Sequence, residues 1–267
     1  MAPLLSIVTV SLNAAGSIGD TLASVAAQRG EVDIEHVCVD GGSRDATRSI
    51  IDAAAARSPR ITRVFEPDRG IYDAMNKGWK ASTGEYVLYL NADDFLVAPD
   101  SSAAAMHGLR PGAADNPDMI VADVAMGRLG SRGLWRHRRV PRLLAGCPQM
   151  GWFPVHQGRL VKRSLIEAVG GFDAGMRLAA DVTQYYDMED LRRLSIRVLR
   201  RDIAFMRAGG AANGSAGAMW LGTREIYAHL RRSRGRVRSA AMALVKTCQS
   251  VSELRYGRCP HRRWFVT

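Results

Sequence analysis

The residues most suited to chemistry are two adjacent carboxylates, Asp93 and Asp94, which come directly after a largely apolar run. They end the segment "EYVLYLNADD", in which the amide side chain of Asn91 stands two positions before Asp93. Adjacent carboxylates repel each other, so both ionise readily only when a cation lies beside them. Oxygen ligands of this kind suit Mg²⁺ or Mn²⁺, and Mg²⁺ commonly joins one or two carboxylates to the phosphates of a substrate. We therefore interpret Asp93 and Asp94 as candidate ligands of a divalent metal that neutralises a phosphate leaving group.

Short β-rich runs alternate with helical patterns in the first hundred residues. The expected strands are residues 4–10, 34–40, 61–66 and 85–90, and the expected helices are residues 17–29, 45–57 and 71–82. This alternation predicts a parallel sheet covered by helices on both faces. Such sheets bind ligands at the carboxyl ends of their strands. All four strands end in polar, acidic or glycine residues, so we expect these ends to form one site.

The ordinary interpretation of each strand end is a turn or a helix N-cap, because Asp and Gly are common at both. Four such ends at one edge favour a shared ligand site instead. Two other nucleotide-binding patterns are missing, since the sequence contains neither G-x-G-x-x-G after the first strand nor G-x-x-x-x-G-K-[ST]. A phosphatase with an aspartyl nucleophile would need a carboxylate at Asn91, because an amide is not a nucleophile.

The alternation loosens after residue 100. The expected elements there are a helix at 99–109, strands at 118–126 and 196–206, a strand and short helix within 150–172, and a helix that carries Asp181 near its N-terminus. A glycine-rich loop follows, and then one or two basic helices. The four cysteines are far apart without metal-binding spacing, so we expect reduced thiols.

The net charge of +11 is concentrated at the C-terminal end of the chain. Residues 201–267 hold 13 of the 37 Lys and Arg but only 3 of the 26 Asp and Glu. Arg clusters there mix with apolar residues, which is typical of an amphipathic helix on anionic lipid. The alternative is a solvated helix face that packs back on the rest of the domain. No apolar run reaches the roughly 18 residues of a membrane span, so we expect a cytoplasmic protein at the inner face of the plasma membrane.

Four segments together resemble family 2 glycosyltransferases of the GT-A fold. They are "SIVTVSLNAAGSIGDTLASVAAQ", "HVCVDGGSRDATRSII", "EPDRGIYDAMNKGWKASTGEYVLYLNADD" and "VHQGRLVKRSLIEAVGGFD", and the resemblance covers about residues 4–215. It implies a Rossmann-like α/β domain with a mixed, mainly parallel sheet flanked by helices. The expected halves are a nucleotide-sugar-binding half (1–98) and an acceptor half (99–215), followed by a basic C-terminal helical extension (216–267).

The resemblance also implies an inverting, metal-dependent transfer of a sugar from a nucleotide diphosphosugar. The positions that match the family's donor-binding residues are Thr9, Asn13, Asp40, Ser43, Asp68, Asp73, Asn76, Lys77 and Asn91. "NADD" occupies the place of the family's D-x-D motif, so Asp93 is expected at the metal, with Asp94 as the next ligand. Asn91 replaces the first carboxylate of that motif and is expected at the ribose.

The acceptor side is expected to carry a base that removes the proton of the attacking hydroxyl. Asp181 of "LAADVTQYY" matches the family's acidic position, and Asp187 is the reserve candidate. His156 and Gln157 match the family's "HQ" and are expected, with Trp152, to contact the acceptor. The implied acceptor is a hydroxyl of a glycan or lipid-linked glycan in the synthesis of cell-surface polysaccharide or glycolipid.

Two other classes stay open at this point. An Arg-rich protein can bind nucleic acid through phosphates, but this leaves the acidic strand ends unexplained, so no nucleic acid is expected. A catalytically inactive scaffold that keeps the fold at a membrane is the other alternative, and Asn91 in place of an acid keeps it open.

Overall fold

A computed structural model describes residues 4–127, 135–138, 140, 153–207 and 215–253 of the chain. The first-half elements are β1 (Leu5–Ser11), α1 (Ile18–Ala26), β2 (Ile34–Asp40), α2 (Thr47–Ala55), β3 (Ile61–Phe65), α3 (Ile71–Ala81), β4 (Tyr86–Tyr89), β5 (Phe95–Leu96) and α4 (Ser101–Met106). The later elements are β6 (Met119–Gly127), β7 (Trp135–Arg138), the 3₁₀ helix η2 (His156–Gly158), β8 (Arg159–Lys162), α5 (Arg163–Ala168), α6 (Ala180–Leu191), β9 (Ile196–Arg207), α7 (Ala216–Arg234) and α8 (Arg236–Glu253).

One curved sheet connects both halves of the protein, with the strand order β3-β2-β1-β4-β8-β6-β9-β5 and β7 paired to β6. The first four strands are parallel, and their register places Ser11 opposite Asp40 and Asp40 opposite Phe65. The polar residues after β1, β2 and β3 therefore leave the sheet at one edge. This confirms the predicted convergence of those strand ends.

The second half of the sheet is mixed. β8 runs antiparallel to both β4 and β6, whereas β6 and β9 are parallel to each other. The predicted mixed sheet is confirmed, and the first four strands along the chain are parallel, as predicted for them. β8 joins the two halves, because it lies between β4 and β6.

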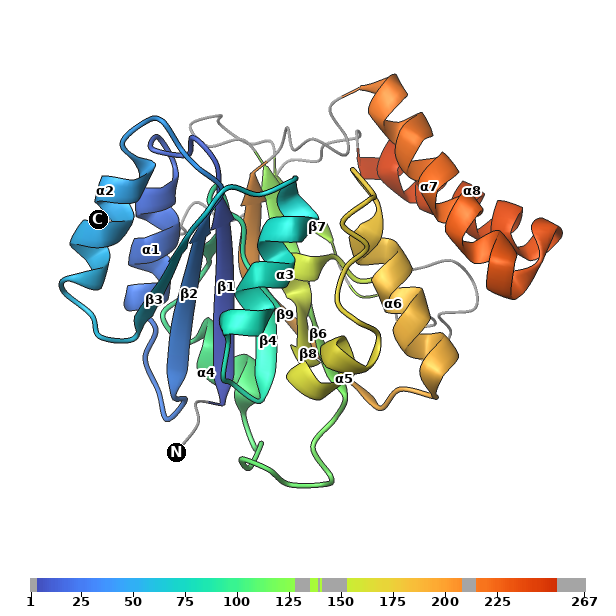
Figure 1. Cartoon of the computed structure of the whole chain (residues 1–267). Coiled ribbons are helices and arrows are strands. Elements are labelled where there is room, and N and C mark those ends of the chain that lie inside the picture. The colour runs from blue at the N-terminus through green and yellow to red at the C-terminus, as the bar shows by residue number, and fades with distance from the viewer. Residues whose placement is uncertain (1–3, 128–134, 139, 141–152, 208–214, 254–267) are drawn as a thin grey trace.

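Helices cover both faces of the sheet (Figure 1). Alternate residues of β1 point to opposite sides, so Val8 packs with Met75 and Trp79 of α3, while Ile7 belongs to a second core. A third group of buried side chains lies under α1 and α2. The all-buried pattern of β1 and β4 follows from this double cover.

The two basic helices pack side by side at the end of the chain (Figure 1). Ile226 and Leu230 of α7 are fully buried in the same core as residues of α6. Met242 and Ala243 of α8 join that core. The predicted basic helices are thus present, and one face of the pair packs on the domain.

The differences from the sequence expectations are local. The helix expected at 99–109 is a six-residue helix, and the strands β5 and β7 were not predicted. β5 has two residues and exists because Phe95 pairs with Phe205 of β9, a distant partner that no local pattern reveals. Within the described ranges, no helix has both the length and the apolar character required to cross a membrane.

Candidate functional site

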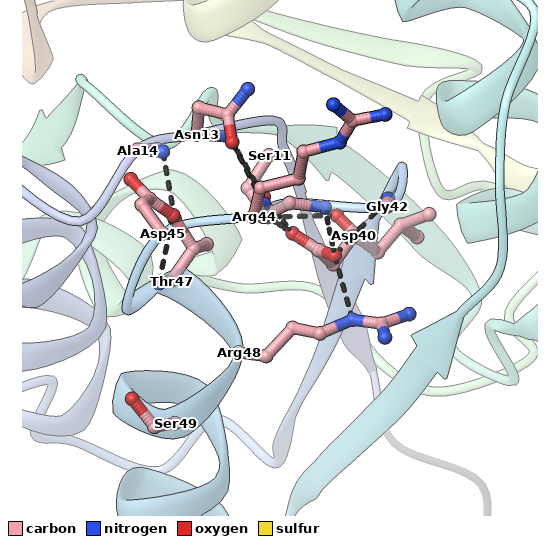
Figure 2. A network of polar contacts seen from close by, with 12 residues as sticks. Ser11, Asn13, Ala14, Asp40, Gly42, Arg44, Asp45, Thr47, Arg48 and Ser49 are labelled. Carbon is pink, nitrogen blue, oxygen red and sulfur yellow. Dashed lines mark hydrogen bonds and ion pairs between the residues drawn. The ribbon is translucent and has the colours of Figure 1, made fainter.

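The loops after β1 and β2 are joined by hydrogen bonds at the sheet edge (Figure 2). The backbone N–H of Asn13 donates to Ser43 Oγ over 2.7 Å, and the N–H of Arg44 donates to Asn13 Oδ1 over 2.9 Å. Asn13 has a φ of 52°, a left-handed conformation that Asn tolerates better than most residues. Ala14 and Thr47 add a further bond of 2.7 Å between the two loops. The predicted residues Asn13 and Ser43 therefore lie together.

Asp40 organises this loop pair from inside the protein. Its side chain is fully buried, and it accepts bonds from Ser43 N (2.9 Å), Gly42 N (3.2 Å) and Arg48 Nε (3.0 Å), as well as from the Ser43 hydroxyl. Burial opposes ionisation of Asp40, but these donors outweigh it and hold its pKa below the usual range. Both carboxylate oxygens already have donors, so Asp40 shapes the loop in this arrangement. Its predicted contact with the nucleotide stays a prediction.

Thr9 matches a donor-binding position of the family and was expected at the loop around the nucleotide. The structure instead places Thr9 within β1, where it is fully buried. Its hydroxyl is 2.9 Å from Nε2 of His36, whose pKa burial lowers to about 4. Thr9 therefore satisfies a buried histidine between β1 and β2 and does not face the edge.

The segment before α3 approaches the β2 loop closely. A Cβ on Gly41 would lie 1.9 Å from Asp68 Oδ2, so a larger residue at position 41 would require the Asp68 side chain to move. Lys77 donates to the carbonyl of Pro67 and lies 3.8 Å from a carboxylate oxygen of Asp73. Asp68, Asp73 and Lys77 thus lie at the same edge as Asp40.

Asn76 has a different role from the one expected. Its side chain donates to the carbonyl of Phe172 and accepts from the N–H of Phe172, both over 2.8 Å. It also accepts from Trp79 Nε1 over 3.1 Å. Gly171 has a φ of +82°, and a Cβ there would lie 2.4 Å from Asn76 Oδ1. Asn76 therefore fastens α3 to the loop after α5, and its amide is occupied by this contact.

Asn91 and Asp93 combine features that fit a cation. Oδ1 of Asn91 is buried and has no hydrogen-bond partner among the described residues. Asp93, two residues later, is half-buried, and its charge contributes to raising the pKa of Asp94. An unsatisfied buried oxygen and a carboxylate two residues further along the chain suit a hard cation such as Mg²⁺ or Mn²⁺. No group of three or more His, Cys, Asp or Glu side chains in the described part of the chain could hold a metal alone.

Asp94 faces the interior of the protein, whereas Asp93 is half-buried. Asp94 is 1% exposed, and it accepts from Gln157 Nε2 over 2.8 Å and from the N–H of Arg207 over 3.0 Å. Burial, with the nearby charge of Asp93, raises the pKa of Asp94 to about 8. Both oxygens of Asp94 are engaged in this arrangement, so Asp93 is the better placed of the two to meet a metal.

Asp181 lies in the first turn of α6 and is held from two other elements. The hydroxyl of Tyr72 on α3 donates to its Oδ1 over 3.2 Å. Nδ1 of His156 in η2 lies 3.5 Å from its Oδ2. Its side chain remains 15% exposed. The reserve candidate Asp187 instead accepts from His229 of α7 over 2.7 Å, in the contact between α6 and α7.

The consecutive residues His156 and Gln157 link the region around Asp94 to the region around Asp181. Gln157 bonds to Asp94 beside the metal candidate, and His156 contacts Asp181. The structure therefore brings the predicted HQ pair, Asp94 and Asp181 together. Trp152 lies outside the described residues.

Two residues of this region were missed by the sequence analysis. Tyr72 carries the hydroxyl that reaches Asp181, and Arg159 donates to the carbonyl of Asp181 over 3.1 Å. A signal for Arg159 was available, because it is a charged residue that opens the short buried strand "RLVK" directly after the HQ pair. Nothing local marks Tyr72, whose partner is 109 residues away.

Comparison with known proteins identifies related sequences. A family model described as "Glycosyl transferase family 2" matches residues 6–178. An uncharacterised glycosyltransferase of Mycobacterium tuberculosis is 32% identical over 186 residues, which cover 67% of this chain and 66% of that protein. A PGL/p-HBAD biosynthesis glycosyltransferase of Mycobacterium bovis is 32% identical over 183 residues, covering 67% of each chain. The chain thus spans about two thirds of the length of these relatives.

Solved structures share the fold at lower identity. TarS of S. aureus has a TM-score of 0.62 at 17% identity, with 94% of this chain and 43% of that chain covered. A mannosyltransferase from Pyrobaculum calidifontis, solved with GDP-Man and Mn²⁺, has a TM-score of 0.62 at 20% identity, with 94% and 75% covered. These matches confirm the predicted GT-A fold.

Proposed function

Because the chain belongs to glycosyl transferase family 2, we propose that it transfers a sugar from a nucleotide diphosphosugar to an acceptor hydroxyl, with inversion at the anomeric carbon. The observation that carries this proposal is the connection made by His156 and Gln157. One short 3₁₀ helix thereby contacts both a candidate base, Asp181, and Asp94, the chain neighbour of the candidate metal ligand Asp93.

The donor would bind at the edge formed by the β1, β2 and β3 loops. Asn13 and Ser43 are tied together there, and Asp68 lies against Gly41. Neighbours in fold are solved with UDP, UDP-GlcNAc or GDP-Man, which supports a nucleotide sugar as the ligand class. Lys77 adds a positive charge beside this edge, which suits a diphosphate.

Asn91 and Asp93 would hold a divalent ion, Mn²⁺ or Mg²⁺. The unsatisfied oxygen of Asn91 supports this assignment, and the Mn²⁺ in the mannosyltransferase structure supports the class of ion. When bound, such an ion neutralises negative charge on the departing diphosphate. Because the protein side chains offer few ligands, phosphate oxygens and water would complete the coordination.

Asp181 would act as the general base. The acceptor oxygen bonds to the anomeric carbon as the bond from that carbon to the diphosphate oxygen breaks, and the hydroxyl proton passes to the Asp181 carboxylate. Tyr72 and His156 fix the orientation of that carboxylate. The partial exposure of Asp181 supports this role, because an acceptor must reach it.

The acceptor is proposed to be a lipid-linked glycan or glycolipid at the inner face of the membrane. One relative is named as a PGL/p-HBAD biosynthesis glycosyltransferase. The outward faces of α7 and α8 support contact with lipid, because Trp220, Val237 and Leu244 are 64%, 86% and 62% exposed. Arg236 and Arg238 flank Val237 and are also exposed. Such a cationic, partly apolar surface suits anionic lipid.

A thermal-shift screen of nucleotide sugars with and without Mn²⁺ tests the proposed activity. A ligand that binds only the folded state at 100 times its Kd adds about 2.7 kcal/mol to the free energy of unfolding. We expect one nucleotide class to raise Tm, and to do so more strongly with Mn²⁺. If no nucleotide sugar changes Tm in either condition, the proposed activity is wrong.

A further inference from the structure

Arg159 is a buried charge directly behind the candidate base. It opens β8, it is 1% exposed, and it ranks among the largest fully buried side chains of the described residues. Its Nη1 donates to the backbone carbonyl of Asp181 over 3.1 Å, and its Nη2 donates to Gln184 Oε1 over 3.2 Å. Its guanidinium also lies 5.9 Å from the ring centre of Tyr185. Every one of these contacts is with α6, the helix that carries Asp181.

This arrangement is unusual for a buried arginine. Among the described residues, no carboxylate side chain lies within ion-pair distance of Arg159, and its direct partners are an amide oxygen, a carbonyl and a ring. Removing a charge from water costs several kcal/mol unless an opposite charge compensates it. The negative group with the largest electrostatic effect on Arg159 is Asp181. The two charges therefore compensate each other inside the protein.

Tyr72 and His156, the described residues seen to contact the Asp181 side chain, are not permanent cations. Tyr72 of α3 is neutral, because burial and the charge of Asp181 raise its pKa well above the usual value. His156 of η2 contacts Asp181 through Nδ1. Glu225 of α7 is a further negative group that acts on Tyr72, and it accepts bonds from the backbone of Arg177 and Leu178. Arg159 of β8 is thus a permanent cation that contacts the Asp181 backbone and acts electrostatically on its side chain.

We propose that Arg159 is a positioning residue that fixes the first turn of α6 and keeps Asp181 ionised at the pH of sugar transfer. The proposal rests on the proposed function, because it assumes that Asp181 is the base. A nearby positive charge favours the ionised carboxylate, and low exposure weakens the screening of this effect by water. A purely structural link between β8 and α6 would use the same hydrogen bonds but would not act on protonation.

The pH dependence of kcat separates these two roles. We would measure kcat from pH 5 to 9, at saturating donor and Mn²⁺, for wild type, Arg159→Met and Arg159→Lys. Arg159→Met removes the positive charge. The acidic limb of the pH–kcat profile, where kcat falls as the pH is lowered, should therefore move to higher pH by about one unit or more. Arg159→Lys keeps the charge, so its acidic limb should stay close to that of wild type even if kcat falls.

Arg234→Met provides a matched control. Arg234 is 7% exposed and lies 4.8 Å from the ring centre of Tyr186, but it bonds to Asp190 instead of facing Asp181. Its loss should lower Tm and leave the acidic limb in place. The proposal is overturned if Arg159→Met leaves the limb at the wild-type pH, or if Arg234→Met moves it equally.

A stability cycle keeps the proposal testable if Arg159→Met folds poorly. Asp181→Asn leaves Arg159 uncompensated, and Arg159→Met leaves Asp181 without its cation. The double variant should therefore lose less Tm than the sum of the two single losses. Additive losses would contradict the proposal. If the proposed function itself is wrong, the result is different: the Asp181→Asn variant transfers sugar at the wild-type rate.

Discussion

Asp93 and Asp94 are neighbours in the chain, but the fold places them in different environments. Asp94 is buried and bonded to Gln157 and to the backbone of Arg207, whereas Asp93 is half-buried and lies two residues after Asn91, whose buried side-chain oxygen has no partner among the described residues. The pair therefore divides into an internal residue that fastens β9 and η2 and an outward residue available to a cation. Two ligands were expected from the sequence, and the geometry favours one carboxylate with one amide.

Asp181→Asn should strongly lower the rate of sugar transfer and leave the affinity for the donor unchanged. The variant keeps the size of the side chain but cannot accept the hydroxyl proton, and loss of a general base typically costs about 10²–10⁴-fold in rate. Single-turnover transfer and donor titration would measure the two effects separately. Asp187→Asn is the matched control, because Asp187 bonds to His229 and should leave the rate near wild type. A larger loss of transfer rate for Asp187→Asn than for Asp181→Asn would indicate that Asp187, and not Asp181, is the base.

Asn76→Ala should destabilise the protein. The substitution removes the hydrogen bonds to both backbone groups of Phe172 and to Trp79 Nε1, and unsatisfied buried groups cost about 1–3 kcal/mol. Chemical denaturation should show a loss of about 2 kcal/mol in the free energy of unfolding. Lys80→Ala, an exposed change on the same helix, should leave this value nearly unchanged. Equal stability of the two variants would contradict the role assigned to Asn76.

At the scale of elements, we expect the contact between α6 and α7 to depend on pH. His229 of α7 bonds to Asp187 of α6 over 2.7 Å, and this bond raises the pKa of His229 above its usual value. The protonated histidine is therefore favoured in the folded state. Its stabilising contribution is fully present below the unfolded pKa of roughly 6.5 and is lost as the pH rises through the higher folded pKa.

His229→Gln should therefore lose more Tm relative to wild type at pH 6 than at pH 9. Thermal unfolding of both proteins across this range measures the difference. The change should become smaller as the pH rises, because wild type then loses its own protonated histidine. A Tm difference that is constant from pH 6 to 9 would contradict this assignment.

Elements with local signals were predictable from the sequence. The first four strands and the polar ends that follow them were predicted because apolar runs and turn residues are local patterns. The loop network of Asn13, Asp40 and Ser43 follows from those ends meeting at one edge. The role of Asn76 was not predictable, because its partner Phe172 is 96 residues away. The two-residue strand β5 likewise depends on distant pairing with β9.

The whole molecule combines an acidic site with a basic end. The helices α7 and α8 pack on the domain through Ile226, Leu230, Met242 and Ala243, so the packing alternative considered from the sequence holds for one face. Their outward face still carries exposed apolar side chains among arginines. These two observations are compatible, since opposite sides of the helix pair are involved. We propose that the outward face holds the enzyme at the surface that contains its acceptor.

Replacing Val237 and Leu244 by Asp should weaken binding to anionic liposomes. The double variant loses apolar contact and adds negative charge, so the partition coefficient should fall by about tenfold or more. Co-sedimentation with vesicles that contain phosphatidylglycerol measures the effect. Leu191→Asp is the control, because Leu191 is 52% exposed on α6, outside the basic helices. Equal liposome binding by wild type and the double variant would remove the membrane proposal.

The most direct test of the proposed site is calorimetric titration of nucleoside diphosphates, with and without Mn²⁺, into wild type and Asp93→Asn. The panel contains the uridine, guanosine and thymidine diphosphates, and Asp115→Asn is the control because Asp115 pairs with Arg110 on the surface. We predict that one diphosphate binds wild type and Asp115→Asn more tightly with Mn²⁺, and that Asp93→Asn loses this dependence on metal. Equal Mn²⁺-dependent binding by Asp93→Asn would show that Asp93 does not hold the ion, and would contradict the account.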